Sequence, residues 1–136
     1  MRRYRLLDHT ADIRLRIFGH NLRELFQNSV YALTDTLTDA KKVRTKVSRS
    51  LKIKGEGNDL LLHALLKEVL FLFDTKRFLT RRLVIKKLSD KILLVTLRGE
   101  RLKDHAIKTE IKAVTYHRLK VEKRRGRWIG EVVLDV

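Results

Sequence analysis

No cysteine occurs in the sequence, and this absence removes two kinds of structure. A chain without thiols has no disulfide framework and cannot bind metal through thiolates, so any metal must be held by oxygen or imidazole ligands. The absence of cysteine also fits a reducing compartment, and we expect a cytoplasmic protein.

The sequence also lacks an apolar run of membrane-spanning length. Its longest hydrophobic segment, residues 60–73, is interrupted by His63, Lys67 and Glu68 and is too short to cross a bilayer. Residues 1–4 contain neither an apolar signal core nor a small-residue cleavage site. We therefore expect no membrane partner and no secretion.

Acidic residues are scarce, with 16 Asp and Glu against 32 Lys and Arg, which gives a formal net charge of +16. Such an excess attracts polyanions, because each phosphate neutralised by Lys or Arg releases counterions. The basic residues are spread along the whole chain, however, and base stacking requires exposed aromatics between cations. Core packing is the expected role of most aromatics in apolar-periodic segments, namely Phe18, Phe26, Phe71 and Phe73. Only Tyr4, Tyr116 and Trp128 are candidates for stacking, so RNA contact through a basic surface stays an alternative.

Several catalytic motifs are missing as well. The segment GEGND at residues 55–59 lacks the lysine and the spacing of a P-loop, and there is no Gly-x-Ser-x-Gly elbow. The five histidines form no His-x-x-x-His or Glu-x-x-His pair of the zinc-site type. His63, on an apolar segment, is expected to be a core or boundary residue.

The periodicity of the apolar residues predicts an α+β fold in one domain, residues 1–136. Alternation with a period of two predicts strands over residues 13–18 and 47–53, with an N-terminal strand before them. Two hairpins follow, one around a turn at Ser89 and Asp90 and one spanning residues 119–134. The total is about seven strands in a mixed or antiparallel sheet, together with about three helices.

Helical spacing predicts the three helices separately. The first covers about residues 22–37, with Asn21 as its cap and Glu24 as the reciprocal partner. The second starts after Asn58 or Asp59 and continues to about Phe73. A short third helix is expected from His105 to about Tyr116.

Acidic residues gather in one loop, within the segment LLDHTADIRL at residues 6–15. Asp8 and Asp12 bracket this loop, and carboxylate oxygens favour hard divalent cations such as Ca²⁺ and Mg²⁺. Two aspartates are too few for a dedicated cation cage. The alternative is that Asp8, Thr10 and Asp12 are turn and capping residues that bond their own backbone.

The chain resembles the archease family in several motifs that follow in the same order. The short motifs are DHTAD at residues 8–12, IKAVTYH at 111–117 and LDV at 134–136. The segments GHNLRELFQNSVYAL and GNDLLLHALLKEVLFLFD and the tripeptide RGE at residues 98–100 extend the resemblance to essentially the whole chain. DHTAD alone is weak evidence, but its combination with the distant motifs is specific.

This resemblance implies an accessory protein rather than an enzyme. Archeases activate the GTP-dependent ligase that joins tRNA halves carrying a 3′-phosphate or cyclic phosphate, by promoting guanylylation of the ligase and its multiple turnover. The resemblance also implies a divalent-metal site formed by Asp12, Asp135 and the main chain of Val136, with Asp8 and His9 as secondary candidates. Calcium is the expected ion, with Mg²⁺ and Mn²⁺ as alternatives.

A terminal strand beside the first hairpin would bring Asp135 and the α-carboxylate of Val136 to Asp12. Carboxylates that share one place repel each other unless a cation neutralises them. Lys112, in the IKAVTYH motif, is the expected counter-charge or phosphate-directed group, and a solvated lysine is the alternative. A basic RNA-binding module and a chaperone-like interaction protein remain alternative functions.

The sequence departs from the family pattern in three respects. Arg14 follows the acidic loop where a small residue is usual, and Ala64 and Leu65 stand where a tryptophan is common. The chain is also strongly basic, whereas archeases are often acidic. These departures leave the matched site residues intact and affect the surface that would meet a partner.

Overall fold

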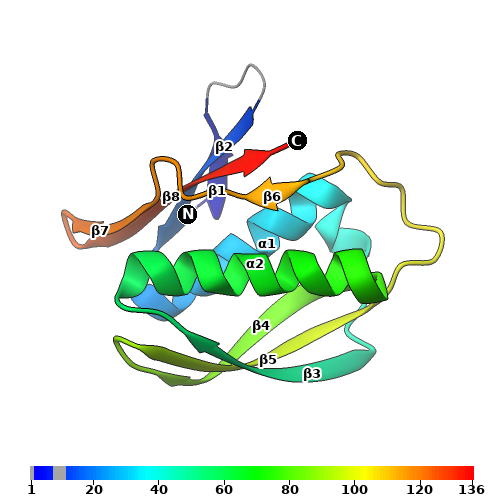
Figure 1. The fold of residues 1–136 in the computed structure, drawn as a ribbon, viewed down its shortest axis with the longest axis horizontal. Helices are drawn as coiled ribbons and strands as arrows, with labels where there is room; N and C mark the ends of the chain where they lie inside the picture. Colours follow the sequence, from blue (N-terminus) through cyan, green and yellow to red (C-terminus); the bar gives the residue numbers. More distant parts are fainter. Residues whose placement is uncertain (1, 8–11) are drawn as a thin grey trace.

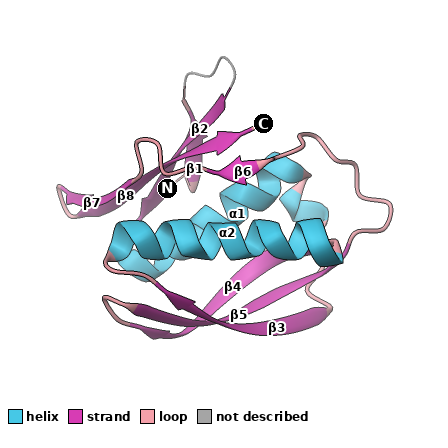
Figure 2. Ribbon diagram, viewed as in Figure 1, coloured by secondary structure: helices cyan, strands magenta, loops and turns pink. Residues whose placement is uncertain are grey.

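Two antiparallel sheets enclose a layer of two α-helices, so the chain has three layers (Figure 1). The structure is a computed structural model and describes residues 2–7 and 12–136. Figure 2 shows the helices between the two sheets, one sheet above them and one below. The predicted α+β class is confirmed, and the single expected sheet is replaced by two.

The first sheet has five strands and contains the strands from both ends of the chain. Its members are β1 (Tyr4–Leu6), β2 (Asp12–Gly19), β6 (Ala113–Val114), β7 (Lys120–Arg124) and β8 (Arg127–Asp135). The order is β1-β2-β8-β6, and β7 also pairs with β8. The predicted strand at residues 13–18 and the closing hairpin are therefore confirmed.

The second sheet has three strands in the order β3-β5-β4. They are β3 (Val47–Lys54), β4 (Phe78–Leu88) and β5 (Ile92–Arg101). Every strand pairing in the described part of the chain is antiparallel, so the mixed alternative does not occur. The predicted turn at Ser89 joins β4 to β5, where the Ser89 N–H donates to the carbonyl of Ile92.

The helical layer consists of α1 (Leu22–Leu37), the short 3₁₀ helix η1 (Ala40–Lys42) and α2 (Asn58–Lys76). The side chain of Asn21 accepts the N–H of Glu24 at 2.8 Å, as predicted for the cap of α1. The carboxylate of Glu24, however, accepts the N–H of His20 rather than that of Asn21. The helix thus begins and ends where the sequence predicts.

The cap predicted for α2 is wrong. Gly57 is the capping residue and provides no side chain, while Asp59 accepts the N–H of Val121 at 2.8 Å and ties the helix start to β7. The helix continues to Lys76, beyond the predicted end at Phe73. No helix among the described residues is long and apolar enough to span a membrane.

The predicted third helix is also wrong, because residues 102–112 form a loop. Main-chain groups of this loop bond to other segments: Lys108 N–H donates to the Leu37 carbonyl, and the Ala106 carbonyl accepts from Thr38 Oγ1. These partners replace the bonds that a helix would make within itself. The spacing of Ile107 and Ile111 therefore reflects no common face, since Ile107 is exposed and Ile111 is buried.

The core lies between the sheets and around the two helices. Leu61, Leu62, Leu65 and Leu66 of α2 have no exposed surface, because the helix is covered by both sheets. A helix buried on several sides is apolar over a wide arc, which explains its leucine-rich sequence. Phe71 departs from the core prediction, since 57% of its surface is exposed.

Candidate functional site

Asp12 and Asp135 lie directly opposite each other at one end of the first sheet. Asp12 begins β2, Asp135 ends β8, and the two residues are Cα partners in the antiparallel ladder. Residues paired in this way have Cβ atoms roughly 4.5–5.5 Å apart on the same face of the sheet. Both are exposed. We call Asp12 and Asp135 the aspartate pair.

The aspartate pair points away from the helical layer. The next residues, Ile13 and Leu134, are also cross-strand partners, and Leu134 is completely buried in the core. Because side chains alternate along a strand, the aspartates lie on the opposite, outer face. Val136, the residue after Asp135, is partly buried and packs against the core, which restrains its main chain beside the aspartate pair.

Lys112 is attached to the aspartate pair through its main chain. Its N–H donates to the carbonyl of Asp135 at 2.8 Å, and the next residue, Ala113, is the cross-strand partner of Asp135. Lys112 is one of the residues that line an apolar groove over α2, and its side chain forms no ion pair with either aspartate among the described residues. The expected counter-charge contact is therefore absent from this arrangement.

The apolar groove beside Lys112 has a volume of about 450 Å³, and its lining includes His63, Phe71, Val114 and Tyr116 together with the charged residues Lys67, Glu68 and Asp74. The rings of His63 and Tyr116 stack with centroids 3.7 Å apart, and His63 Nε2 donates to the carbonyl of Val114 at 2.9 Å. Burial lowers the pKa of His63 below its usual range. His63 is thus a buried, hydrogen-bonded histidine, as the sequence indicates.

Arg14 and Arg16 converge on Glu131, which precedes Asp135 by four residues on the same face of the sheet. Arg16 Nε donates to Glu131 Oε1 at 2.8 Å, and Arg14 Nη2 lies 3.8 Å from Glu131 Oε2. Glu131 is buried, so its charge requires these partners. The unusual Arg14 is accommodated by this ion pair, which was not predicted from the sequence. The sequence feature that could have indicated this ion pair is Glu131 itself, an acidic residue within the apolar segment that forms β8.

The chemistry of the aspartate pair fits a hard divalent cation. Two exposed carboxylates on one face, with the main chain of Val136 adjacent, offer only oxygen ligands, which suit Ca²⁺ or Mg²⁺. No cluster of three or more His, Asp or Glu side chains suited to a metal occurs among residues 2–7 and 12–136. The secondary candidates Asp8 and His9 lie outside the described residues.

Comparisons with known proteins agree on one family. The sequence profile of the Archease protein family matches residues 4–136. Protein archease of Archaeoglobus fulgidus is 35% identical over 141 residues, covering 98% of this chain and 99% of the relative. Protein archease of Pyrococcus abyssi is 35% identical over 142 residues and is covered completely.

Two solved structures share the fold. The solution structure of Methanobacterium thermoautotrophicum protein 1598 has a TM-score of 0.84 at 31% identity, with both chains fully covered. The crystal structure of an archease from Thermotoga maritima, described as a possible chaperone, has a TM-score of 0.67 at 22% identity, covering 100% of this chain and 98% of that one. The curated relatives carry the name archease rather than the name of a catalyst.

Proposed function

Since the chain belongs to the archease family, we propose that it is an accessory protein that activates a GTP-dependent RNA ligase. The partner would join tRNA ends that carry a 3′-phosphate or cyclic phosphate. The accessory protein would promote guanylylation of the ligase and so its multiple turnover. On this proposal the chain has no catalytic activity of its own.

The observation that supports this function is the aspartate pair at the exposed end of the first sheet. Like charges directly opposite on neighbouring strands destabilise a sheet, so their placement needs another reason. Asp12, Asp135 and the main chain of Val136 would hold a divalent cation, most readily Ca²⁺, and Asp8 and His9 are further candidate ligands. A bound cation would supply positive charge for phosphate groups at the partner's active site.

Lys112 connects the aspartate pair to a surface suited to a protein partner. Its main-chain N–H donates to the carbonyl of Asp135, and Lys112 is also one of the residues that line the apolar groove. Tyr116 and Phe71 border that groove with 64% and 57% of their surfaces exposed. Exposed aromatics around a hollow are frequent anchors in protein interfaces. We propose that the ligase contacts this groove and that Lys112 is directed toward its phosphate-bearing active site.

A ligation assay tests this proposal. A GTP-dependent RNA ligase from the same cell, limiting against 3′-phosphate RNA with GTP and divalent metal, should turn over at least tenfold more often with the wild-type protein. Asp12→Ala and Lys112→Ala should remove most of this stimulation. Asp90→Ala, an exposed aspartate in the β4–β5 turn, should retain it. Absence of stimulation by the wild-type protein would refute the function.

A chaperone-like activity is a second candidate, supported by the same exposed aromatics of the apolar groove. It predicts that the protein suppresses the aggregation of unfolded proteins other than the ligase. Phe71→Ser should abolish this suppression, whereas Asp12→Ala should leave it intact. Light scattering of a heated client enzyme distinguishes the two candidates, because only ligase activation depends on Asp12.

A further inference from the structure

Four arginines surround a hollow of about 620 Å³ on the side of the molecule where β1, η1 and β4 approach α1. We call this cavity the arginine hollow. Its lining includes Arg3, Arg44, Arg81 and Arg82, together with Tyr31 of α1. These residues come from distant parts of the sequence. The fold thus gathers charges that look evenly spread along the chain.

The arginines are held in defined positions. Arg3 places its guanidinium 4.0 Å from the centre of the Tyr31 ring, and Arg81 lies 5.9 Å from the same ring. Arg81 Nη1 also donates to the carbonyl of Ala40 at 3.0 Å. Positioned guanidinium groups lose less freedom when they bind a ligand.

Arg44 is positioned by a buried carboxylate. Its main-chain N–H donates to Glu100 Oε2 at 2.7 Å, and His105 Nε2 contacts the same oxygen at 3.0 Å. Burial raises the pKa of Glu100, but the hydrogen bonds from Arg44 and His105 outweigh it, so the pKa lies below the usual range. Glu100 therefore stays ionised and fixes the backbone beneath the Arg44 side chain.

The arginine hollow carries uncompensated positive charge. No carboxylate lines it, and within the described part of the chain none of its arginines forms an ion pair. Like charges around one concavity repel each other, and an anion bound between them reduces this repulsion. Other arginines of the same chain are paired, as Arg16 is with Glu131 and Arg124 with Glu122.

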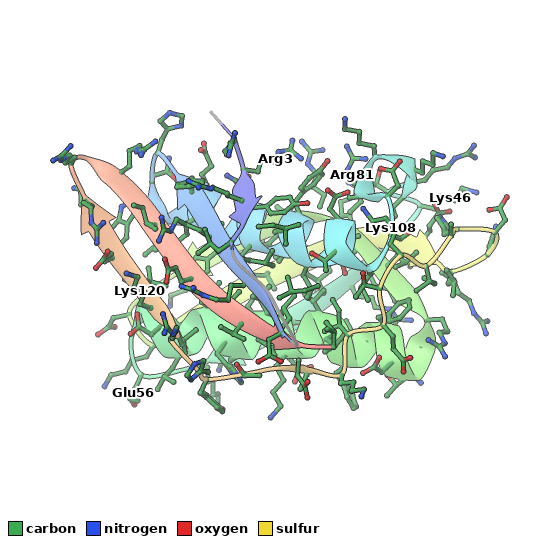
Figure 3. The ribbon with its side chains drawn as sticks, turned by 90° about the horizontal axis from the view of Figure 1, so that it is seen from above. Arg3, Lys46, Glu56, Arg81, Lys108 and Lys120 are labelled. Atoms are coloured by element: carbon green, nitrogen blue, oxygen red, sulfur yellow. The ribbon has the colours of Figure 1, made fainter. Side chains whose placement is uncertain are left out.

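A second hollow of about 620 Å³ continues the basic surface, and Arg44 lines both. Its lining includes Lys42, Lys46, Lys103 and Lys108, together with three acidic residues. In Figure 3, Arg3, Arg81, Lys108 and Lys46 follow one another on one side of the molecule, away from Glu56 and Lys120. The surface is therefore elongated, which suits a chain of phosphates better than a single anion.

We propose that the arginine hollow and its continuation bind the phosphodiester backbone of a single-stranded nucleic acid, without sequence preference. Guanidinium forks match phosphate oxygens in geometry and charge. The Tyr31 ring is already covered by Arg3, so that face is not available for stacking a base. This surface is separate from the aspartate pair, and the inference goes beyond ligase activation.

The test measures binding of fluorescent single-stranded RNA, and of DNA with the same sequence, at several salt concentrations. The variant Arg3→Glu, Arg44→Glu, Arg82→Glu reverses three exposed charges of the arginine hollow. Its control, Lys52→Glu, Lys54→Glu, Lys87→Glu, makes the same charge change at exposed positions that line neither hollow. Matched glutamine variants check the result, and thermal unfolding checks that each protein is folded.

We expect the arginine variant to bind RNA and DNA at least tenfold more weakly, and the lysine control to bind within about twofold of wild type. The log-log salt slope should become shallower by about 2, from about 0.7 for each of three lost phosphate contacts. An equal loss in both variants, or tighter binding of a polyglutamate peptide than of RNA, overturns the proposal. The assay contains no ligase, so the result of the binding measurement does not depend on whether the protein activates one.

Discussion

Asp12 and Asp135 face each other across the β2–β8 ladder, and among residues 2–7 and 12–136 no cationic side chain forms an ion pair with either. Opposed carboxylates of this kind raise the free energy of the folded chain unless a cation lies between them. The stability of the protein should therefore respond to divalent metal through these two side chains.

The variant Asp12→Asn distinguishes the repulsion between the two carboxylates from the stabilisation by a bound cation. In a chelator it should raise the free energy of unfolding by about 0.2–1 kcal/mol, because one of two opposed charges is removed. Calcium at about 100 times its dissociation constant should stabilise the wild type by about 2.7 kcal/mol and leave Asp12→Asn unchanged. Thermal unfolding with and without calcium checks both, with Asp90→Asn as control. Equal calcium shifts in wild type and Asp12→Asn would exclude the metal site.

The Glu131 carboxylate should be a major source of stability in the first sheet. Glu131→Ala leaves Arg14 and Arg16 without their partner and should lower the free energy of unfolding by about 1.5–3 kcal/mol. Glu122→Ala, which breaks surface ion pairs with Lys120 and Arg124, should cost less than about 1 kcal/mol. Urea unfolding of both variants measures the difference. Similar costs would show that the burial of Glu131 has no energetic consequence.

Gly99 should tolerate no side chain. A Cβ atom at this position would lie 1.8 Å from the carbonyl oxygen of Leu79, so β4 would have to move. Overpacking of this kind costs about 1–3 kcal/mol, and a clash with backbone belongs at or above the upper end. At Gly130 a Cβ meets only side-chain atoms, at 3.4 Å or more, so Gly130→Ala should cost less. Chemical denaturation of the two alanine variants checks the order.

The stability should fall with acid through His63. Its pKa is lowered in the folded state by burial, so the unfolded chain binds a proton more readily. The contribution of neutral His63 is fully present above its ordinary pKa of 6.5 and is lost as the pH falls toward the lowered value. His63→Gln should lose less stability than wild type between about pH 7 and 5. His117→Gln, which leaves His63 in place, should behave as wild type does.

Local patterns were the predictable part of this fold. The period of two in β2, and the Asn21 cap with the apolar spacing of α1, are each encoded within a few residues. The helix predicted near residues 102–112 was wrong because helical spacing over a short stretch does not show which groups its main-chain N–H and C=O groups bond to. The division of the strands into two sheets depends on distant pairings, which periodicity does not contain.

The approach of Asp12 and Asp135 could be predicted from the sequence, whereas the arrangement of the residues around them could not. The expected approach of the terminal strand to the first hairpin corresponds to the pairing of Asp12 with Asp135, and metal binding there stays a prediction. The position of Lys112 beside the apolar groove depends on β6, a two-residue strand that no sequence pattern indicated. The ion pair of Arg16 with Glu131 joins residues 115 positions apart, and its prediction required the register of β8.

The central place of β8 has a consequence for how the molecule is made. This strand contacts β2, β6 and β7, yet it is the last element of the sequence. During synthesis the β1–β2 hairpin leaves the ribosome long before β8 is made. The edge of β2 that pairs with β8 therefore stays unpaired until the whole intervening chain has been synthesised. Closure over such a separation is slow, so assembly of the first sheet should be the late step of folding. The aspartate pair therefore forms only after β8 has been synthesised and has paired with β2.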